Sequence, residues 1–212
     1  SSLSGDKRYV MKIVAEKIIH KTDVGGLRFG LSAGDVSSAA SDMLNKFKKD
    51  DPYGVMVVEE ISYRKGLGSE LLLGVYQDEF FGPTAAIGFG GTATERYKEI
   101  MKDGAAQIFF PASVECDEFN EILKRHPVIE HLEGRVRGFE KMISFEDVKK
   151  AYDAVRSLGL VFSHLNSEVP FVIEEIDINP AVVSGGRLIA LDGVVRVSKN
   201  SRKKIFAKPI NI

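Results

Sequence analysis

The stretch Glu175-Ile176-Asp177-Ile178-Asn179-Pro180, followed by the turn Ser184-Gly185-Gly186-Arg187, carries the clearest structural signal in this chain. Polar and apolar residues alternate along the stretch, which is typical of a β-strand whose polar side chains share one face. The two adjacent glycines are typical of a tight hairpin turn, because such turns need positive φ at both central positions. Pro180 has no N–H group and sits where pairing between strands can be interrupted. We therefore predict a β-hairpin that returns from Arg187 toward Asp192.

A two-residue turn at Gly185-Gly186 also predicts the register of this hairpin. It places Asn179 directly opposite Asp192, and Asp177 lies on the same face as Asn179. Opposed Cβ atoms lie about 4.5–5.5 Å apart, so the amide oxygen and the carboxylate can reach one cation. A few oxygen ligands suit Mg²⁺, which shares its coordination shell with waters and phosphates. We predict a metal–phosphate site here; the alternative is a set of polar side chains that only face solvent.

The composition excludes several classes of protein. The 212 residues include 29 basic and 30 acidic ones, and the net charge of −1 argues against a nucleic acid or a membrane surface as partner. No apolar run approaches the roughly 18 residues that cross a bilayer. The single cysteine, Cys116, excludes an internal disulfide and fits a reducing cytoplasm. We expect a cytoplasmic globular protein.

Strand and helix patterns are mixed along the chain, with several antiparallel hairpin signals. Strand patterns occupy residues 9–14, 27–31, 53–61, 70–76, 83–87 and 108–110, and helical patterns occupy 36–47, 93–102, 118–125 and 128–132. A longer helix opens at Ser144, where Asp147 three residues later completes a start that resembles a capping box. This order favours an α+β fold over a doubly wound parallel sheet.

Two other segments have the chemistry of a nucleotide site. The chain has neither a Walker motif nor a dinucleotide-binding fingerprint. It has Lys12 on a strand, followed by His20-Lys21-Thr22-Asp23-Val24-Gly25-Gly26, where an ammonium group and backbone N–H groups can meet phosphates. The imidazole of His20 can take a phosphoryl group. The alternatives are a solvated strand lysine and an ordinary surface histidine.

Glu59 and Glu60 end a strand before a loop. Nucleotide bases are often held at such a position by main-chain groups and a nearby carboxylate. The alternative is a pair of ordinary exposed glutamates.

Together these segments resemble one family. They are Met11-Lys12-Ile13-Val14, Ile19 to Gly26, Gly88-Phe89-Gly90-Gly91 with Glu95, and Glu175 to Pro180 with Leu191-Asp192. Through these segments the chain resembles the ATP-grasp β subunit of ADP-forming (NDP-forming) acyl-CoA synthetases, in particular the acetyl-CoA synthetase type. The resemblance extends from about residue 9 to 197. The His-Lys-Thr-Asp-Val-Gly-Gly segment is the more specific part of the likeness.

The resemblance implies an ATP-grasp fold, in which two α+β subdomains grip the nucleotide. Residues 1–60 would form a first subdomain with the phosphate loop, 61–197 a second with the metal hairpin, and 198–212 a basic tail. Only eight residues precede Tyr9, so the strand–helix segment that comes first in the family is missing, and we expect the first subdomain to be incomplete.

The resemblance also implies roles for single residues. His20 would ferry the phosphoryl group, and Asn179, Asp192 and Asp177 would bind Mg²⁺. The residues expected to bind ATP or ADP are Lys12, Lys21, Gly25, Gly26, Glu59, Glu60, Glu70 and Glu95. Among these, Glu59 and Glu60 would lie at the adenine hinge, and Glu70 near the ribose and phosphates.

The implied reaction is acyl-CoA + ADP + phosphate ⇌ carboxylate + CoA + ATP, through an acyl phosphate and phosphohistidine. The implied partner is a CoA-binding α subunit or fused α domain, in a hetero-oligomer. One alternative is a regulatory ATP-grasp module without catalysis, as in domains fused to protein acetyltransferases. Another is an ATP-grasp ligase that joins a carboxylate to an amine, which leaves His20 unexplained.

Overall fold

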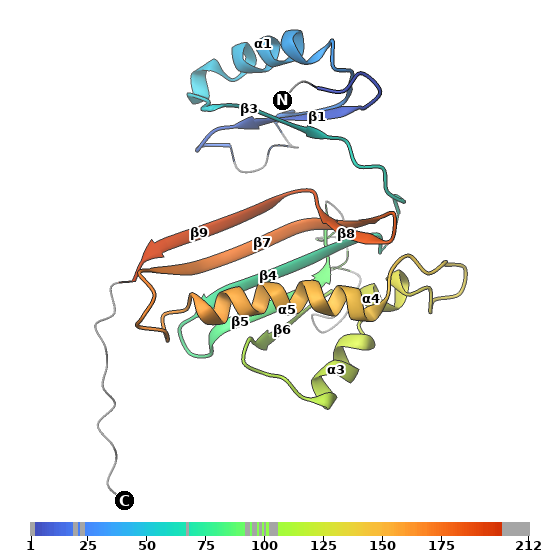
Figure 1. Cartoon of the computed structure of the whole chain (residues 1–212), viewed down its shortest axis with the longest axis vertical. Helices are drawn as coiled ribbons and strands as arrows, with labels where there is room; N and C mark the ends of the chain where they lie inside the picture. The colour runs from blue at the N-terminus through green and yellow to red at the C-terminus, as the bar shows by residue number, and fades with distance from the viewer. Residues whose placement is uncertain are drawn as a thin grey trace, which may run out of the picture. The chain divides into compact units, whose positions relative to one another are not determined.

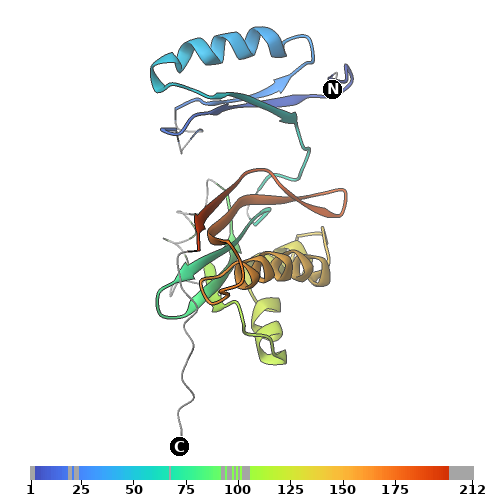
Figure 2. The ribbon, with the colours of Figure 1, turned by 60° about the vertical axis from the view of Figure 1, so that its left-hand side comes forward.

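The computed structural model describes residues 3–18, 21, 24–66, 68–91, 94, 97, 99, 101 and 106–200. The chain divides into two compact units, Ser1–Ser62 and Tyr63–Ile212, which are drawn in Figures 1 and 2. The division into 1–60, 61–197 and 198–212 stays a prediction. Helices and antiparallel sheets occur in each unit, so the predicted α+β class is confirmed.

The smaller unit is a three-stranded antiparallel sheet with one helix. Its strands have the order β2 (Leu27–Leu31), β1 (Tyr9–Val14) and β3 (Gly54–Glu59). Helix α1 (Val36–Lys46) packs on one face, and a short 3₁₀ helix, η1 (Lys48–Asp50), follows it. Its buried core comprises Met11, Ile13, Ile18, Ala39, Met43 and Phe47. Alternate residues of β1 thus face the helix, as strand periodicity requires.

The larger unit contains a six-stranded antiparallel sheet. The strand order is β6-β5-β4-β7-β8, and β9 pairs with β7. The strands are β4 (Glu70–Asp78), β5 (Gly82–Phe89), β6 (Gln107–Pro111), β7 (Phe171–Ser184), β8 (Arg187–Ala190) and β9 (Gly193–Lys199). The described helices are α3 (Asp117–Lys124), α4 (Pro127–Leu132) and α5 (Phe145–Val161). Most of the predicted helix 93–102 lies outside the described residues.

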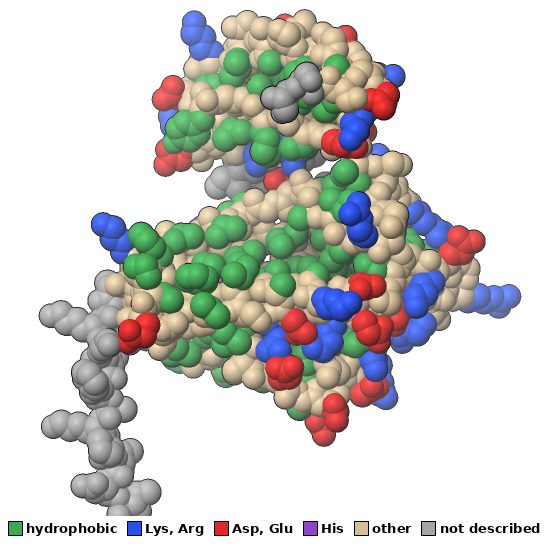
Figure 3. All heavy atoms as spheres, in the orientation of Figure 1, with side chains coloured by type: hydrophobic (Ala, Val, Ile, Leu, Met, Phe, Trp, Pro, Cys, Tyr) green, Lys and Arg blue, Asp and Glu red, His purple; other side chains and the backbone are tan. Residues whose placement is uncertain are grey.

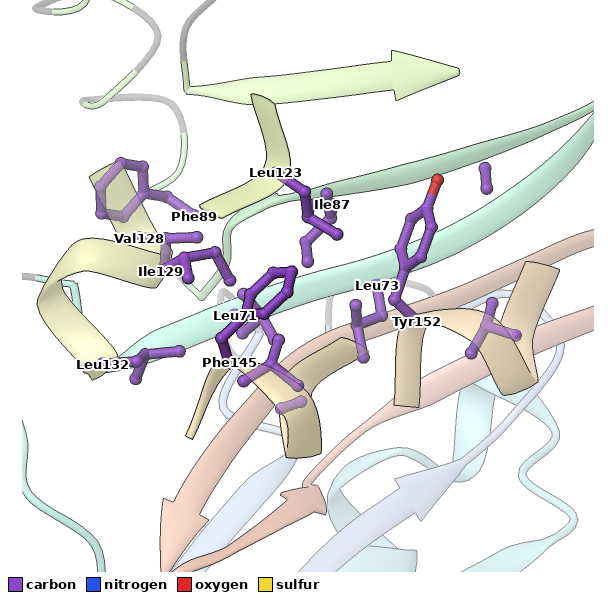
Figure 4. Close-up of a cluster of buried hydrophobic side chains, with 14 of the residues drawn as sticks. Leu71, Leu73, Ile87, Phe89, Leu123, Val128, Ile129, Leu132, Phe145 and Tyr152 are labelled. Carbon is purple, nitrogen blue, oxygen red and sulfur yellow. The ribbon is translucent and has the colours of Figure 1, made fainter. Parts of the chain in front are cut away.

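The core of the larger unit lies between its sheet and its helices. Figure 4 shows Leu71 and Leu73 of β4 and Ile87 and Phe89 of β5 pointing toward side chains of α3, α4 and α5. Tyr152 of α5 is among the largest fully buried side chains. Burial of this apolar surface supplies the main favourable free energy of folding.

The hairpin predicted from the glycine pair is confirmed. Ser184 faces Arg187 and Ala181 faces Ala190, and the φ angles of Gly185 and Gly186 are 56° and 73°. Both central residues therefore have the positive φ of a type I′ turn, whose twist matches that of the flanking strands.

Strand β9 was not predicted. It follows β8 after Asp192, and its residues pair with β7 from Ile178 opposite Gly193 to Phe171 opposite Lys199. Its valines remain exposed, with 45%, 59% and 57% of Val194, Val195 and Val197 accessible. Figure 3 shows apolar side chains gathered on the face of the larger unit where β7 and β9 lie. The strand runs two residues past the predicted boundary at 197.

Among the residues that the structure describes, no helix has both the length and the apolar character needed to cross a membrane.

The start of α5 gives a stability prediction. The Ser144 hydroxyl accepts a hydrogen bond from the Asp147 N–H at 3.2 Å and donates one to the Asp147 carboxylate at 2.7 Å. We expect Ser144→Ala to lower the free energy of unfolding by about 1 kcal/mol, because an N–H group of the first turn loses its partner. Urea denaturation measures this difference.

Ser157→Ala is the matched control, because Ser157 is exposed within the same helix. Alanine has the higher helix propensity there, so this variant should be as stable as the original chain or slightly more stable. Equal effects of the two substitutions would contradict a capping role for Ser144.

Candidate functional site

A β-bulge in β7 positions the predicted metal ligand Asn179. On β4, only Leu72 lies between Leu71 and Leu73, whereas on β7 both Asn179 and Pro180 lie between the partners of these leucines, Ala181 and Ile178. An extra residue of this kind bends the strand and redirects its side chains. The peptide bond between Asn179 and Pro180 is cis.

The bulge brings Asn179 to the glycine-rich segment after β5. The Gly91 N–H donates to Asn179 Oδ1 at 2.7 Å, so the side-chain oxygen is oriented by a backbone group. The Asn179 N–H in turn donates to the Asp192 carbonyl at 3.2 Å, as expected if the two residues face each other. The structure thus places Asn179 and Asp192 side by side, although their role as metal ligands stays a prediction.

Glu70 lies next to Gly90 and Gly91, in the same part of the larger unit as Asn179. It opens β4, and its carbonyl accepts a hydrogen bond from the Gly90 N–H at 2.8 Å. Gly91 has φ +77°, and a Cβ atom on it would overlap with Glu70 Oε2. The Glu70 carboxylate and the Asn179 amide therefore both lie against Gly91. Only glycine can adopt the backbone conformation at this position without strain.

Tyr63 holds the Glu70 carboxylate and was not predicted. Its hydroxyl donates to Glu70 Oε1 at 2.7 Å. Burial, followed by the hydrogen bond to the Glu70 carboxylate and its negative charge, raises the pKa of Tyr63 to about 12. Tyr63 is therefore a neutral donor at physiological pH. The sequence carries no signal for this contact, because Tyr63 belongs to a segment interpreted only as a loop.

The carboxylates around Asp177 repel one another. Burial raises the pKa of Asp177 above its ordinary value, and the negative charges of Glu175 and Asp192 raise it further. Glu175 pairs with Arg196 at 3.0 Å. A divalent cation near Asp177 and Asp192 would offset this repulsion.

The donor set fits Mg²⁺. It consists of the carboxylates of Asp177 and Asp192 and the amide oxygen of Asn179, and Mg²⁺ is usually held by one or two carboxylates together with waters and substrate phosphates. Within the described part of the chain, no group of three or more His, Cys, Asp or Glu residues is arranged to hold a metal ion.

In the smaller unit, Lys12 lies in the middle of β1. It pairs with Leu27 of β2 and with Met56 of β3, and 7% of it is exposed. Lys12 is therefore buried and does not lie on a solvated strand face, and its contact with phosphates stays a prediction. Burial of a lysine is costly unless polar or negatively charged groups compensate for it.

The glycine pair of the predicted phosphate loop is packed tightly. Gly25 has φ +66°, and a Cβ atom on Gly26 would lie 2.6 Å from Ile13 Cγ2. The Lys21 carbonyl accepts a hydrogen bond from the Gly26 N–H at 2.7 Å. A side chain at position 25 would strain the backbone, and one at position 26 would collide with Ile13. The structure brings Lys21 and Gly26 together.

Glu59 and Glu60 make contacts within the smaller unit. Glu59 forms an ion pair with Lys7 at 2.6 Å, and Glu60 Oε2 accepts a hydrogen bond from the Gly30 N–H at 2.7 Å. Their assignment to an adenine hinge stays a prediction. Two other predicted site residues, His20 and Glu95, lie outside the described residues.

Gly91 gives the second prediction. Gly91→Ala should lower the free energy of unfolding, because alanine is strained at positive φ and its methyl group would displace the Glu70 carboxylate. Gly138→Ala is the matched control: φ is +89° there, and no atom lies within 4 Å of the added Cβ. We expect Gly91→Ala to cost about 1 kcal/mol more than the control in urea denaturation, and equal costs would contradict the close approach of Glu70.

Asp177 gives the third prediction. Because its folded-state pKa lies above the ordinary value of 3.8, the ionised carboxylate destabilises the metal-free fold, and this penalty grows as the pH rises through that range. Asp177→Asn should therefore be more stable than the original chain at pH 7 in the presence of a chelator. The difference should shrink as the pH falls toward 4, where Asp177 takes up a proton in the original chain. An equal or lower stability of the variant at pH 7 would contradict the repulsion.

Comparison with known proteins identifies the family. The model of an ATP-grasp domain matches residues 5–197. The β subunit of ADP-forming acetate–CoA ligase I from Pyrococcus furiosus is 30% identical over 196 residues, which cover 89% of this chain and 75% of that subunit. The ADP-forming 4-hydroxybutyrate–CoA ligase of Nitrosopumilus maritimus is 29% identical over 179 residues, but the match covers 82% of this chain and only 23% of that longer protein.

Solved structures show the same fold. The dinucleotide-forming acetyl-coenzyme A synthetase 1 of Ca. Korarchaeum cryptofilum, in complex with coenzyme A and Mg-AMPPCP, matches with a TM-score of 0.63 and 26% identity. The match covers 88% of this chain and 75% of that one, and that protein has a phosphohistidine segment that points towards its nucleotide-binding site. These findings confirm the resemblance and the ATP-grasp fold. The chain belongs to the ATP-grasp domain family, in the group that contains the β subunits of ADP-forming acetate–CoA ligases.

Proposed function

We propose that this chain is the nucleotide-binding, phosphoryl-transferring part of an ADP-forming acyl-CoA synthetase. The convergence of Glu70, Gly91 and Asn179 at the bulge of β7, with Asp192 opposite Asn179, is the observation that supports it most. The overall reaction is acyl-CoA + ADP + phosphate ⇌ carboxylate + CoA + ATP. The names of the relatives support ADP-forming acid–CoA ligation as the reaction class.

His20 carries the phosphoryl group in this proposal. In the direction from ATP, an imidazole nitrogen attacks the γ-phosphorus, the bond to the bridging oxygen breaks, and the electron pair leaves with ADP. In the direction of ATP synthesis, the same bond forms again and the imidazole is released. Histidine suits such a relay because an N-phosphoryl imidazole forms and breaks readily.

The other residues hold the nucleotide and neutralise charge. Lys12 and Lys21 contact phosphates, together with the backbone around Gly25 and Gly26. Asp177, Asn179 and Asp192 would hold Mg²⁺, which spreads the negative charge of the transferring group. Glu59 and Glu60 lie at the adenine hinge, Glu70 lies near the ribose and phosphates, and Glu95 also binds the nucleotide.

A partner completes the reaction. The chain spans three quarters of the β subunit that it resembles and about a quarter (23%) of the 4-hydroxybutyrate–CoA ligase. The name of the first relative, a β subunit, supports a CoA-binding α subunit or fused α domain as the partner. We place the protein in a cytoplasmic hetero-oligomer with that partner, and its small-molecule ligand is a nucleotide.

Phosphoryl labelling tests this proposal. The purified chain, with and without the CoA-binding partner, is incubated with γ-labelled ATP and Mg²⁺ and then analysed by peptide mapping. We expect an acid-labile, base-stable phosphate on the peptide that contains His20, and His20→Ala should abolish it because the nucleophile is lost.

His164→Asn is the matched control. His164 belongs to the larger unit and contacts Glu174 at 3.0 Å, so labelling of this variant should equal that of the original chain. Retained labelling in His20→Ala would contradict the assignment of His20. Nucleotide binding without phosphohistidine, even with the partner present, would favour the regulatory module instead.

A further inference from the structure

Lys46, the last residue of α1, lies against the backbone of the glycine loop. Its ammonium group donates hydrogen bonds to the carbonyl oxygens of Val24 at 2.9 Å and Gly25 at 3.1 Å. A Cβ atom on Gly25 would lie 2.7 Å from Lys46 Nζ. The ammonium group also lies 4.9 Å from the centre of the Phe47 ring, a cation–π contact that limits where it can move.

Gly26, the next residue of this loop, is also held by hydrogen bonds. The Gly26 carbonyl accepts a hydrogen bond from the Ile13 N–H of β1 at 2.9 Å, and the Gly26 N–H donates to the Lys21 carbonyl at 2.7 Å. Lys21 and Gly26 are thus hydrogen-bonded to each other, and Gly26 is also bound to the sheet. Lys46 acts on the two residues just before Gly26.

These contacts determine which way the peptide groups face. In a planar trans peptide, the C=O and N–H groups point in opposite directions. With the Val24 carbonyl held by Lys46, the Gly25 N–H points away from the ammonium group; with the Gly25 carbonyl held, the Gly26 N–H points toward Lys21. The Gly26 N–H is thus engaged by the Lys21 carbonyl, whereas the Gly25 N–H faces the side opposite the ammonium group, where it can donate to an anion.

We propose that Lys46 is a positioning residue for phosphoryl transfer: it holds the carbonyl groups of Val24 and Gly25 so that the Gly25 N–H is presented to the transferring phosphate. This inference rests on the proposed function. Lys46 does not need to contact the nucleotide, because its effect passes through the two carbonyl groups that it binds.

Three variants test the proposal under the conditions that label the original chain. Lys46→Met removes the donor, and Lys46→Arg keeps donors for both carbonyls. Lys48→Met removes the same charge from the exposed 3₁₀ helix that follows. We expect Lys46→Met to slow phosphohistidine formation at saturating ATP by about tenfold, the effect of losing roughly one charged hydrogen bond. Lys46→Arg should restore the rate to within about twofold, and Lys48→Met should react like the original chain.

Amide hydrogen exchange adds a readout that does not depend on activity. The Gly25 and Gly26 amides should exchange faster in Lys46→Met than in Lys48→Met, because the peptide groups have lost their support. The dissociation constant for ADP should change less than the transfer rate, as expected for misplacement rather than lost binding.

The outcomes separate the two proposals. If the original chain is labelled on His20 and Lys46→Met is labelled equally fast, the positioning role is wrong and the proposed function stands. Equal slowing by Lys48→Met would overturn the positioning role as well, because a general charge effect would explain both variants. If the original chain forms no phosphohistidine with its partner, the proposed function fails and the role of Lys46 in transfer fails with it.

Discussion

At the bulge in β7, Asn179 and Pro180 share the space opposite a single residue of β4, Leu72, and the site of the larger unit depends on this irregularity. A regular ladder would leave the polar face of β7 as a straight row of side chains. The bulge instead brings the Asn179 amide within hydrogen-bond distance of Gly91. Gly91 can lie there because it lacks the Cβ atom that would overlap with Glu70. The contact between Asn179 and Gly91 therefore requires both the bulge in β7 and a glycine at position 91.

The hairpin around this bulge could be predicted from the sequence, because a Gly-Gly turn permits few loop geometries and the register follows from the turn. The contact between Tyr63 and Glu70 could not be predicted from the sequence, because it depends on how the loop before β4 folds back onto that strand. Strand β9 was missed because Asp192-Gly193 looks like the end of the hairpin and its valines lie among basic residues. Leu158 continues the apolar spacing of Val148 and Val155 along α5 but is 44% exposed. Gly159 instead faces inward, against Val75.

The larger unit keeps a charge arrangement that folding alone does not favour. Asp177 is partly buried near the carboxylates of Glu175 and Asp192, and Glu175 forms an ion pair with Arg196. An apolar or amide side chain at position 177 would remove the repulsion at little cost in packing. A carboxylate there is instead what a divalent cation and its phosphate ligands require. The proposed Mg²⁺ site would account for both the unfavourable electrostatics and the oxygen donor set.

In the smaller unit, the glycine loop is limited by its surroundings rather than by its own sequence. Gly26 must be glycine because Ile13 of β1 approaches it, and Gly25 because of its positive φ and the nearby Lys46 ammonium group. The loop sequence alone suggests backbone that approaches a phosphate, but it does not show which way the peptide groups face. That orientation comes from β1, before the loop, and from Lys46, twenty residues after Gly26. The helix C-terminus is an electrostatically suitable place for such a lysine, because its carbonyl groups favour a positive charge. The Lys46 ammonium group also binds the neighbouring loop, and so the packing of α1 is linked to the geometry of the glycine loop.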